Sequence, residues 1–374
     1  MVEMANLPED IMKEILLRLP VKILLRFRCV SQDWRSLISD SFFITLYNNN
    51  RFREKNTSLI LTDGTAFYTI VDNSCHKLDI PLLTCTKLEN WWHEIKVLGL
   101  CNGLLCFSLI RSSWIHNEDP IYLLNPATRE LKKLPPGPCE RSHCNFIRCG
   151  FGFDPMSNSY KVVKILYYYE NSTNESDVWV YSSNLDNWRK LGDIPVPDLD
   201  LDLDFSFSCN SRTLVFNAAM HWIVYLKDGS GCLVSSIFSF DLVHEVFSEL
   251  PQPPEKGSYK DMMVMEGCLS VFGINSETRS YWVMKEYGVQ ESWTKQHSWT
   301  KQHIFYDLIG LAHAPVQLWH DELLLHYFTE KFLLYNTKNK TVRNHVILGL
   351  PTKFKVFVYT EGLVTLKGFP TSAG

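Results

Sequence analysis

The sequence lacks several features that would assign it to a broad functional class. Its 374 residues contain no run of 18 or more apolar residues and no signal peptide, so we predict neither a membrane span nor export. The formal net charge is only −4, from 37 basic and 41 acidic residues that are interspersed along the chain. This balance gives no reason to expect nucleic acid or a membrane surface as a partner.

Motifs for common enzyme chemistry are also missing. There is no GxSxG or HExxH motif, and Gly150-Phe151-Gly152 lacks the third glycine and following helix of a dinucleotide-binding loop. Cys139, Cys144 and Cys149 do not have the spacing of a zinc ribbon, which favours core or loop thiols. We therefore expect no catalytic residue, no metal and no cofactor.

The cysteines and the aromatic content indicate the setting and the kind of core. Eleven cysteines are scattered without the close spacing of a small secreted disulfide framework, so reduced thiols and a cytoplasmic or nuclear location are expected. A hydrophobic content of 45% predicts a packed core, and an aromatic content of 13% favours strands.

Residues 7–38 have the pattern of a compact helical segment. Apolar residues at three- and four-residue spacing predict three short helices, with a break at Pro20 and a candidate N-cap at Ser31. Helices of about 10 residues are marginal alone, and a unit of about 40 residues buries too little surface to be stable alone. The segment also has more large apolar side chains than three short helices can hide, which indicates a partner surface.

With Leu7-Pro8 at its start, Leu19-Pro20 in its middle and Trp34, Leu37 and Ile38 near its end, this segment resembles an F-box. The F-box is the N-terminal module of the receptor subunits of SCF (Skp-cullin-F-box) ubiquitin ligases. The resemblance implies that its apolar positions bind a Skp-type adaptor and, through it, a cullin. Ile23, Gln32 and Ser41 depart from the common family pattern, but no central apolar position is lost. The alternative is a helical cap packed on its own domain. The predicted adaptor-binding residues are Leu7, Pro8, Ile11, Ile15, Leu16, Leu19, Pro20, Val21, Leu24, Leu25, Phe27, Cys29, Val30, Trp34, Leu37 and Ile38.

The rest of the chain has a different pattern. We predict an α+β multidomain protein, with a helical module at 1–47, a polar connector at 48–57 and an all-β domain at 58–374. In the last region an apolar residue is repeatedly followed by another seven positions later, across a turn-forming segment. The predicted pairs are Leu124 with Leu131, Tyr181 with Trp188, Phe240 with Phe247 and Tyr335 with Val342, together with a looser Val71–Leu78 pair and a nine-residue Met284–Trp293 pair.

The spacing of these pairs predicts a propeller. The first residues Leu124, Tyr181, Phe240, Met284 and Tyr335 are 57, 59, 44 and 51 residues apart, and a period near 50 is typical of propeller blades. Each is preceded by another apolar strand, as a several-stranded blade requires. We therefore predict about six blades, possibly seven, with residues 354–365 closing the ring or joining a further blade. A β-sandwich is the alternative, although it does not explain the period.

Several repeats have a distinctive wording: GLCNGLLCF at 99–107, LLNPATRELKKLPP at 123–136, GFGFDPMSNSYKVVKI at 150–165, VYSSNLDNWRKL at 180–191 and WVMKEYGVQESWTK at 282–295. These motifs resemble the plant F-box-associated domain, which is often described as kelch-like. The resemblance implies a propeller that binds a target protein for ubiquitination and proteasomal degradation. S-locus F-box proteins of pollen, which recognise self-incompatibility ribonucleases, share this architecture, and so do receptors for unrelated targets.

Two local features suggest further hypotheses. Asp198, Asp200, Asp202 and Asp204 alternate with leucines, so an extended chain would place four carboxylates on one face for a basic target protein. A solvated loop between blades is the alternative. The tandem SWTKQH at 292–303 adds six residues, an even number that preserves strand phase, and we interpret it as a tolerated duplication.

Together these patterns predict a non-catalytic receptor subunit of a ubiquitin ligase. Its helical module would bind the adaptor and its propeller would bind an unidentified target protein. Two other functions stay open from sequence: a propeller enzyme with a helical extension, and an adaptor-bound regulator that delivers no substrate.

Overall fold

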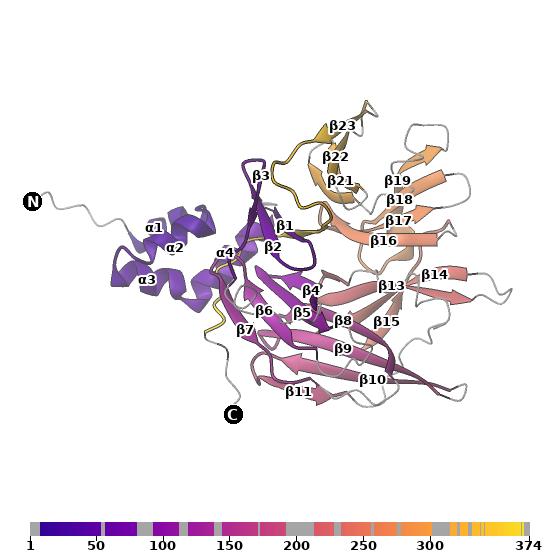
Figure 1. The fold of residues 1–374 in the computed structure, drawn as a ribbon, viewed down its shortest axis with the longest axis horizontal. Coiled ribbons are helices and arrows are strands. Elements are labelled where there is room, and N and C mark those ends of the chain that lie inside the picture. Colours follow the sequence, from indigo (N-terminus) through magenta and orange to yellow (C-terminus); the bar gives the residue numbers. More distant parts are fainter. Residues whose placement is uncertain are drawn as a thin grey trace, which may run out of the picture.

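The computed structural model consists of a small helical module and a ring of β-sheets (Figure 1). It describes residues 8–369 except 54–56, 81–92, 112–118, 138–143, 171–172, 192–212, 228–232, 256–257, 275–277, 301–314, 320–321, 328–330, 337, 340 and 368. Within these residues, four α-helices precede six four-stranded sheets. The predicted helical module with an all-β propeller is confirmed, and the separate sheets exclude the β-sandwich.

The helices begin where the sequence supplies caps and breaks. They are α1 (Glu9–Leu17), α2 (Val21–Phe27), α3 (Gln32–Ser39) and α4 (Ser41–Arg53). Pro8 and Pro20 directly precede α1 and α2, where the missing proline N–H costs no helical hydrogen bond. The Ser31 hydroxyl accepts a hydrogen bond from the Trp34 amide at 3.2 Å, which confirms the predicted N-cap of α3.

The fourth helix was not predicted. The Asp40 carboxylate accepts a hydrogen bond from the Phe43 amide at 2.9 Å and so caps the start of α4. The helix continues through the predicted boundary at residue 47 and covers the first part of the predicted connector at 48–57. Tyr47 is fully buried, and its hydroxyl donates to the Leu19 carbonyl oxygen at 2.9 Å. Packing of α4 therefore overrides the polar composition that suggested a connector.

The six sheets are the propeller blades, and we number them in chain order. Blade one contains β24 (Lys355–Tyr359), β1 (Ser58–Thr62), β2 (Phe67–Val71) and β3 (Ser74–Lys77). Blade two contains β4 (His93–Cys101), β5 (Leu104–Arg111), β6 (Ile121–Asn125) and β7 (Glu130–Lys133). Blade three contains β8 (Cys144–Asp154), β9 (Ser159–Glu170), β10 (Thr173–Ser182) and β11 (Asn187–Lys190).

The other three blades have the same antiparallel order. Blade four contains β12 (Leu214–Phe216), β13 (Ala219–Lys227), β14 (Leu233–Asp241) and β15 (Phe247–Leu250). Blade five contains β16 (Ser258–Met265), β17 (Cys268–Ile274), β18 (Thr278–Met284) and β19 (Trp293–Thr300). Blade six contains β20 (Pro315–Trp319), β21 (Glu322–Tyr327), β22 (Lys331–Asn336) and β23 (Val342–His345).

The ring is closed by pairing between distant parts of the chain. Strand β24 pairs antiparallel with β1, from Ser58 opposite Tyr359 to Thr62 opposite Lys355. It takes the place in blade one that the first strand in sequence takes in each other blade. Strand β24, within the predicted segment 354–365, therefore completes the first blade, and the described strands form six blades without a seventh.

The predicted cross-strand pairs are confirmed in five blades. Leu124 lies opposite Leu131, Tyr181 opposite Trp188, Phe240 opposite Phe247, Met284 opposite Trp293 and Tyr335 opposite Val342. A side-chain oxygen supports several of these turns. The Asn125, Asp241 and Asn336 side chains each accept two backbone hydrogen bonds from the turn that follows.

The Val71–Leu78 pair was wrong. Val71 lies opposite Ser74, because Asp72 and Asn73 form a two-residue hairpin turn with φ values of +50° and +58°. Such a tight turn leaves no room for a seven-residue spacing. Blade one therefore has a shorter outer hairpin than the repeat predicted.

The hydrophobic core is divided among the interfaces between neighbouring blades. Among the described residues, six apolar clusters each join the facing surfaces of two adjacent blades, including blades six and one. The largest buried side chains in these clusters include Phe107, Phe151, Trp222, Phe240 and Phe332. Each blade is thus stabilised by burial against both neighbours, which makes the ring a single packed body.

The first SWTKQH copy lies mostly in β19, and the junction with the second copy is inside the same strand. Tyr281 pairs with His297 and Trp282 with Lys295, so Gln296 is an additional residue at a β-bulge. Residues 301–303 of the second copy lie outside the described residues.

Candidate adaptor-binding surface

The helical module has its own small core, and four predicted adaptor-binding residues belong to it. Leu16, Val21, Leu24 and Ile38 are all buried and pack with Phe43 and Tyr47 of α4. Burial in this core means that the four residues stabilise the module. Their contact with an adaptor stays a prediction.

The exposed apolar side chains define the surface that is free for a partner. Ile11 and Ile15 of α1 are each 48% exposed and lie one helical turn apart on the same face. Val30, in the turn between α2 and α3, is 67% exposed. Phe42 is also 67% exposed, but sequence analysis missed it because α4 was not predicted. Exposure of large apolar side chains to water is unfavourable in the free protein. Their presence on this face therefore indicates a binding surface.

The other predicted residues lie at the margin between core and surface. Phe27 and Trp34 form an edge-to-face pair with ring centroids 4.9 Å apart, and both are partly exposed. Leu19, Leu25 and Leu37 are also partly buried against the module core, whereas Pro8, Pro20 and Cys29 are exposed. Leu7 lies outside the described residues.

The module packs directly on the ring. Ile44 of α4 packs against the core between blades two and three, and Ala127 in the β6–β7 turn packs against the module core. Figure 1 shows the helices beside the strands of blades one and two. The partly buried Arg28 guanidinium donates to the Ile38 carbonyl oxygen at 3.1 Å. Burial lowers the Arg28 pKa, whereas the negative charge of Glu130 in blade two raises it.

The two ends of the ring differ in their connections. In an antiparallel blade, the turns after the first and third strands lie at one end, and the other connections lie at the opposite end. The β6–β7 turn that touches the helical module belongs to the first group. The module therefore lies at the end of the ring that carries the turns after the first and third strands. Asp198, Asp200, Asp202 and Asp204 follow β11 and precede β12 in the chain but lie outside the described residues.

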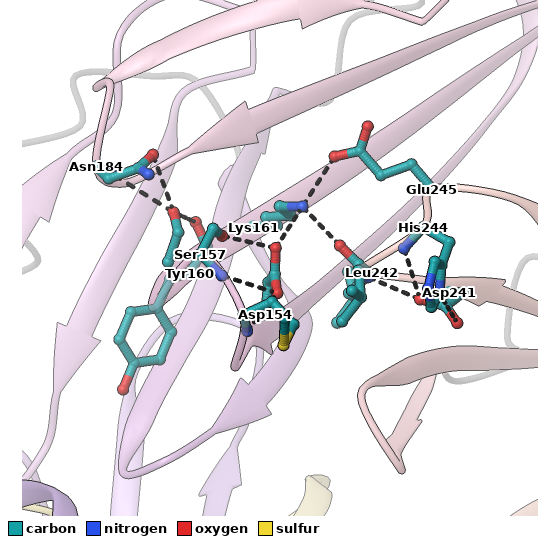
Figure 2. Close-up of polar contacts among 12 residues, drawn as sticks. Asp154, Ser157, Tyr160, Lys161, Asn184, Asp241, Leu242, His244 and Glu245 are labelled. Atoms are coloured by element: carbon teal, nitrogen blue, oxygen red, sulfur yellow. Dashed lines mark hydrogen bonds and ion pairs between the residues drawn. The ribbon is translucent and has the colours of Figure 1, made fainter.

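A buried ion cluster joins blades three and four at their turns, and Figure 2 shows its contacts. The Lys161 ammonium lies 2.8 Å from Asp154 Oδ2 and 2.8 Å from Glu245 Oε1, and donates to the Leu242 carbonyl oxygen at 2.6 Å. Arg189 also pairs with Glu245. Burial opposes ionisation of Asp154, but the hydrogen bonds from Lys161, Ser157 and the Met156 amide together outweigh it and lower the pKa to about 2. Every charge in the cluster has a partner, which indicates a structural brace between blades.

Other side chains that could take part in chemistry are also held in packing contacts. His221 of blade four is buried, with Nδ1 3.3 Å from the Leu214 carbonyl oxygen and Nε2 2.6 Å from the Tyr287 hydroxyl of blade five. Burial lowers the pKa of His221 to about 4, so its imidazole is neutral at pH 7. Among the described residues, no group of three or more histidine, cysteine and acidic side chains could hold a metal ion. No helix in the described ranges is long and apolar enough to cross a membrane.

A helical module of this kind joined to a six-bladed ring defines an F-box receptor architecture, and comparison with known proteins agrees. Residues 65–366 match the F-box associated beta propeller domain, and residues 4–45 match the F-box domain. The chain therefore belongs to the F-box proteins that carry an F-box-associated propeller. F-box proteins of this family are receptor subunits of SCF complexes, in which the F-box binds a Skp-type adaptor.

Similar proteins are known from Arabidopsis thaliana. The F-box/kelch-repeat protein At3g23880 is 30% identical over 76% of this chain and 76% of its own length. F-box protein At3g07870 is 27% identical over 98% of this chain and 93% of its own length. F-box protein CPR1 is 25% identical over 76% of this chain and 70% of its own length. The similarity thus extends through both the helical module and the ring.

Proposed function

We propose that this chain is the substrate receptor of an SCF ubiquitin ligase, and that it acts by positioning rather than by catalysis. The exposed apolar face of α1 carries the proposal, because Ile11 and Ile15 lie in the F-box and are free for an adaptor. Val30 extends the apolar surface into the turn after α2. The Skp-type adaptor would connect the chain to a cullin, and the whole assembly would act in the cytoplasm or nucleus.

The ring supports this role because it packs directly against the module. A ligase receptor raises the effective concentration of a target lysine near the ubiquitin-charged enzyme, and this effect depends on fixed geometry. Packing of Ile44 and Ala127 across the junction provides such an attachment. The transfer chemistry would take place on the conjugating enzyme, so the proposed role requires no catalytic residue in this chain.

Substitution of the exposed face tests adaptor binding without disturbing the core. The double variant Ile11→Asp, Ile15→Asp is expected to weaken binding to a purified Skp-type adaptor at least about 100-fold, since it removes two apolar contacts and adds charge. Met156→Asp is the matched control, because Met156 is 81% exposed in a turn of blade three. Calorimetric titration measures the binding. Equal affinity of the double variant and wild type would contradict the proposal.

We also propose that the ring captures a protein target. The four aspartates at 198, 200, 202 and 204 would attract a basic surface, and this part rests on the sequence alternation. Changing all four to asparagine should weaken target capture and reduce its salt dependence. Affinity purification under proteasome inhibition, with wild type and the four-residue variant in parallel, would identify targets that depend on these charges. Unchanged capture would remove the aspartates from the proposal.

A narrower proposal names the target as a self-incompatibility ribonuclease. It is supported by the architecture that this chain shares with S-locus F-box proteins, which receptors for unrelated targets also have. Direct titration of the purified receptor–adaptor complex with S-locus ribonucleases tests it. A ribonuclease that is captured and then ubiquitinated only when the F-box is intact is the expected result, and absence of binding to all of them would reject this target.

A further inference from the structure

The segment Gly362–Leu366, which we call the strap, connects the ring to the helical module. It begins three residues after β24 and appears as the yellow chain beside α4 in Figure 1. The fully buried Asn125 side chain donates hydrogen bonds from Nδ2 to the Gly362 carbonyl oxygen at 3.1 Å and to the Val364 carbonyl oxygen at 2.7 Å. One side chain of blade two therefore holds two carbonyl groups of the strap backbone.

Two further contacts hold the strap against blade two. Glu130 Oε2 accepts hydrogen bonds from the Leu366 amide at 2.7 Å and the Thr365 hydroxyl at 2.9 Å. At the other end, the backbones of Gly103 and Gly362 approach so closely that a Cβ on Gly103 would lie 2.5 Å from the Gly362 Cα atom. Gly103 also has a φ of +80°, so both its conformation and its neighbour require glycine.

The strap contributes a side chain to the core of the helical module. Leu363 is fully buried in the same cluster as the inward-facing leucines, isoleucine and valine of α1, α2 and α3. A small helical unit has few apolar side chains to bury, so the loss of one large member removes a substantial part of its stabilisation. The module core is therefore completed by a residue that follows β24, more than 300 positions after α3.

We propose that the strap is a positioning element that makes order in the F-box depend on closure of the ring. Pairing of β24 with β1 sets where the strap begins, Asn125 and Glu130 set its path, and Leu363 completes the helical core. A chain whose ring has not closed then lacks a fully packed adaptor-binding module. The consequence for adaptor binding rests on the function proposed above, whereas the consequence for helical order does not.

The substitution Asn125→Asp separates the strap contact from the turn. Aspartate keeps the oxygen that caps the β6–β7 turn, as Asp241 does in blade four, but removes both Nδ2 donors to the strap. Asn336→Asp is the matched control, because Asn336 caps the equivalent turn of blade six in the same way. Leu363→Ala tests the core contact directly and leaves the strap backbone intact.

Hydrogen–deuterium exchange of the full chain and adaptor titration give separate readouts. In Asn125→Asp and Leu363→Ala, amide exchange in α1, α2 and α3 should become at least tenfold faster, and adaptor binding at least tenfold weaker. Asn336→Asp should match wild type in both. Wild-type exchange in both strap variants overturns the proposal. Undiminished adaptor binding despite faster exchange overturns its consequence for adaptor binding. A wild-type chain that does not bind adaptor rejects the proposed function, while the exchange data still decide whether the strap orders the helices.

Discussion

The indole of Trp188 in blade three donates a hydrogen bond to the carbonyl oxygen of Pro135, which follows the outer strand of blade two, at 3.1 Å. Trp293 of blade five repeats this contact with Pro251 after blade four, at 2.9 Å. In both cases the tryptophan starts or nearly starts the outermost strand of its blade. The contact therefore fastens the outer edge of one blade to the end of the preceding one.

Trp188→Phe should destabilise the protein by about 1–3 kcal/mol, because it removes the N–H donor and part of a buried ring. The Pro135 carbonyl oxygen would then lose the indole N–H that donates to it. Urea unfolding followed by circular dichroism measures the loss. Trp293→Phe should cost a similar amount, and a change below about 0.5 kcal/mol in both variants would show that the contact contributes little.

Alanine substitution of two neighbouring residues of α1 should change stability by very different amounts. Leu16→Ala should destabilise the helical module by about 2–5 kcal/mol, because Leu16 is buried. Ile15→Ala should change stability by at most about 0.5 kcal/mol, because Ile15 is half exposed. Hydrogen exchange of the module amides measures both. A larger loss for Ile15→Ala than for Leu16→Ala would contradict the assignment of core and surface.

The ion cluster between blades three and four predicts a loss of stability in acid. The pKa of Asp154 is lowered in the folded protein from an ordinary value of 3.8 to about 2. Burial opposes ionisation of Glu245, but its contacts with Lys161 and Arg189 together lower the pKa of Glu245 as well. Their stabilisation is therefore present above about pH 4 and lost as pH falls towards about 2. Asp154→Asn should make the free energy of unfolding less dependent on pH between about 4 and 2. Urea titration at several pH values measures this dependence.

The matched control is Asp72→Asn, because Asp72 is exposed in the β2–β3 turn and can be replaced there by asparagine without strain. This variant should keep the wild-type acid dependence. An equal acid dependence in Asp154→Asn would show that the cluster does not govern stability at low pH.

His221 predicts a second effect at higher pH. Its pKa is lowered by burial from 6.5 to about 4, so the unfolded chain binds more protons than the folded one in that interval. The stabilisation is complete above about pH 6.5 and decreases as pH falls towards about 4. His221→Gln should reduce this decrease, with the exposed His76→Gln as control. A pH dependence equal to wild type in His221→Gln would reject this explanation.

The repeat structure was largely predictable from sequence because strand pairing is local in each blade. An apolar residue, a turn-forming segment and a second apolar residue fixed the outer hairpin in blades two to six. Blade one departed from the pattern because Asp72 and Asn73 form a tighter turn. The possible partners of residues 354–365 could not be distinguished, since pairing with β1 depends on the closed ring.

The candidate adaptor surface was less predictable. Helical spacing shows which residues share a face, but it does not show whether that face meets its own chain or another. Leu16 and Ile15 are adjacent in sequence, yet one is buried and the other half exposed. The buried side depends on Phe43 and Tyr47 of an unpredicted helix and on Leu363 from a distant segment. No local pattern around α1 contains that information.

Closure by β24 has a consequence for how this protein is made. Nearly 300 residues separate β1 from β24, so at a synthesis rate of about 5–20 residues per second β1 emerges from the ribosome about 15–60 s before its partner. During that interval one edge of β1 has open backbone donors and acceptors, which can pair with other chains. We therefore expect the newly made chain to be vulnerable to aggregation through β1 until β24 has paired with it.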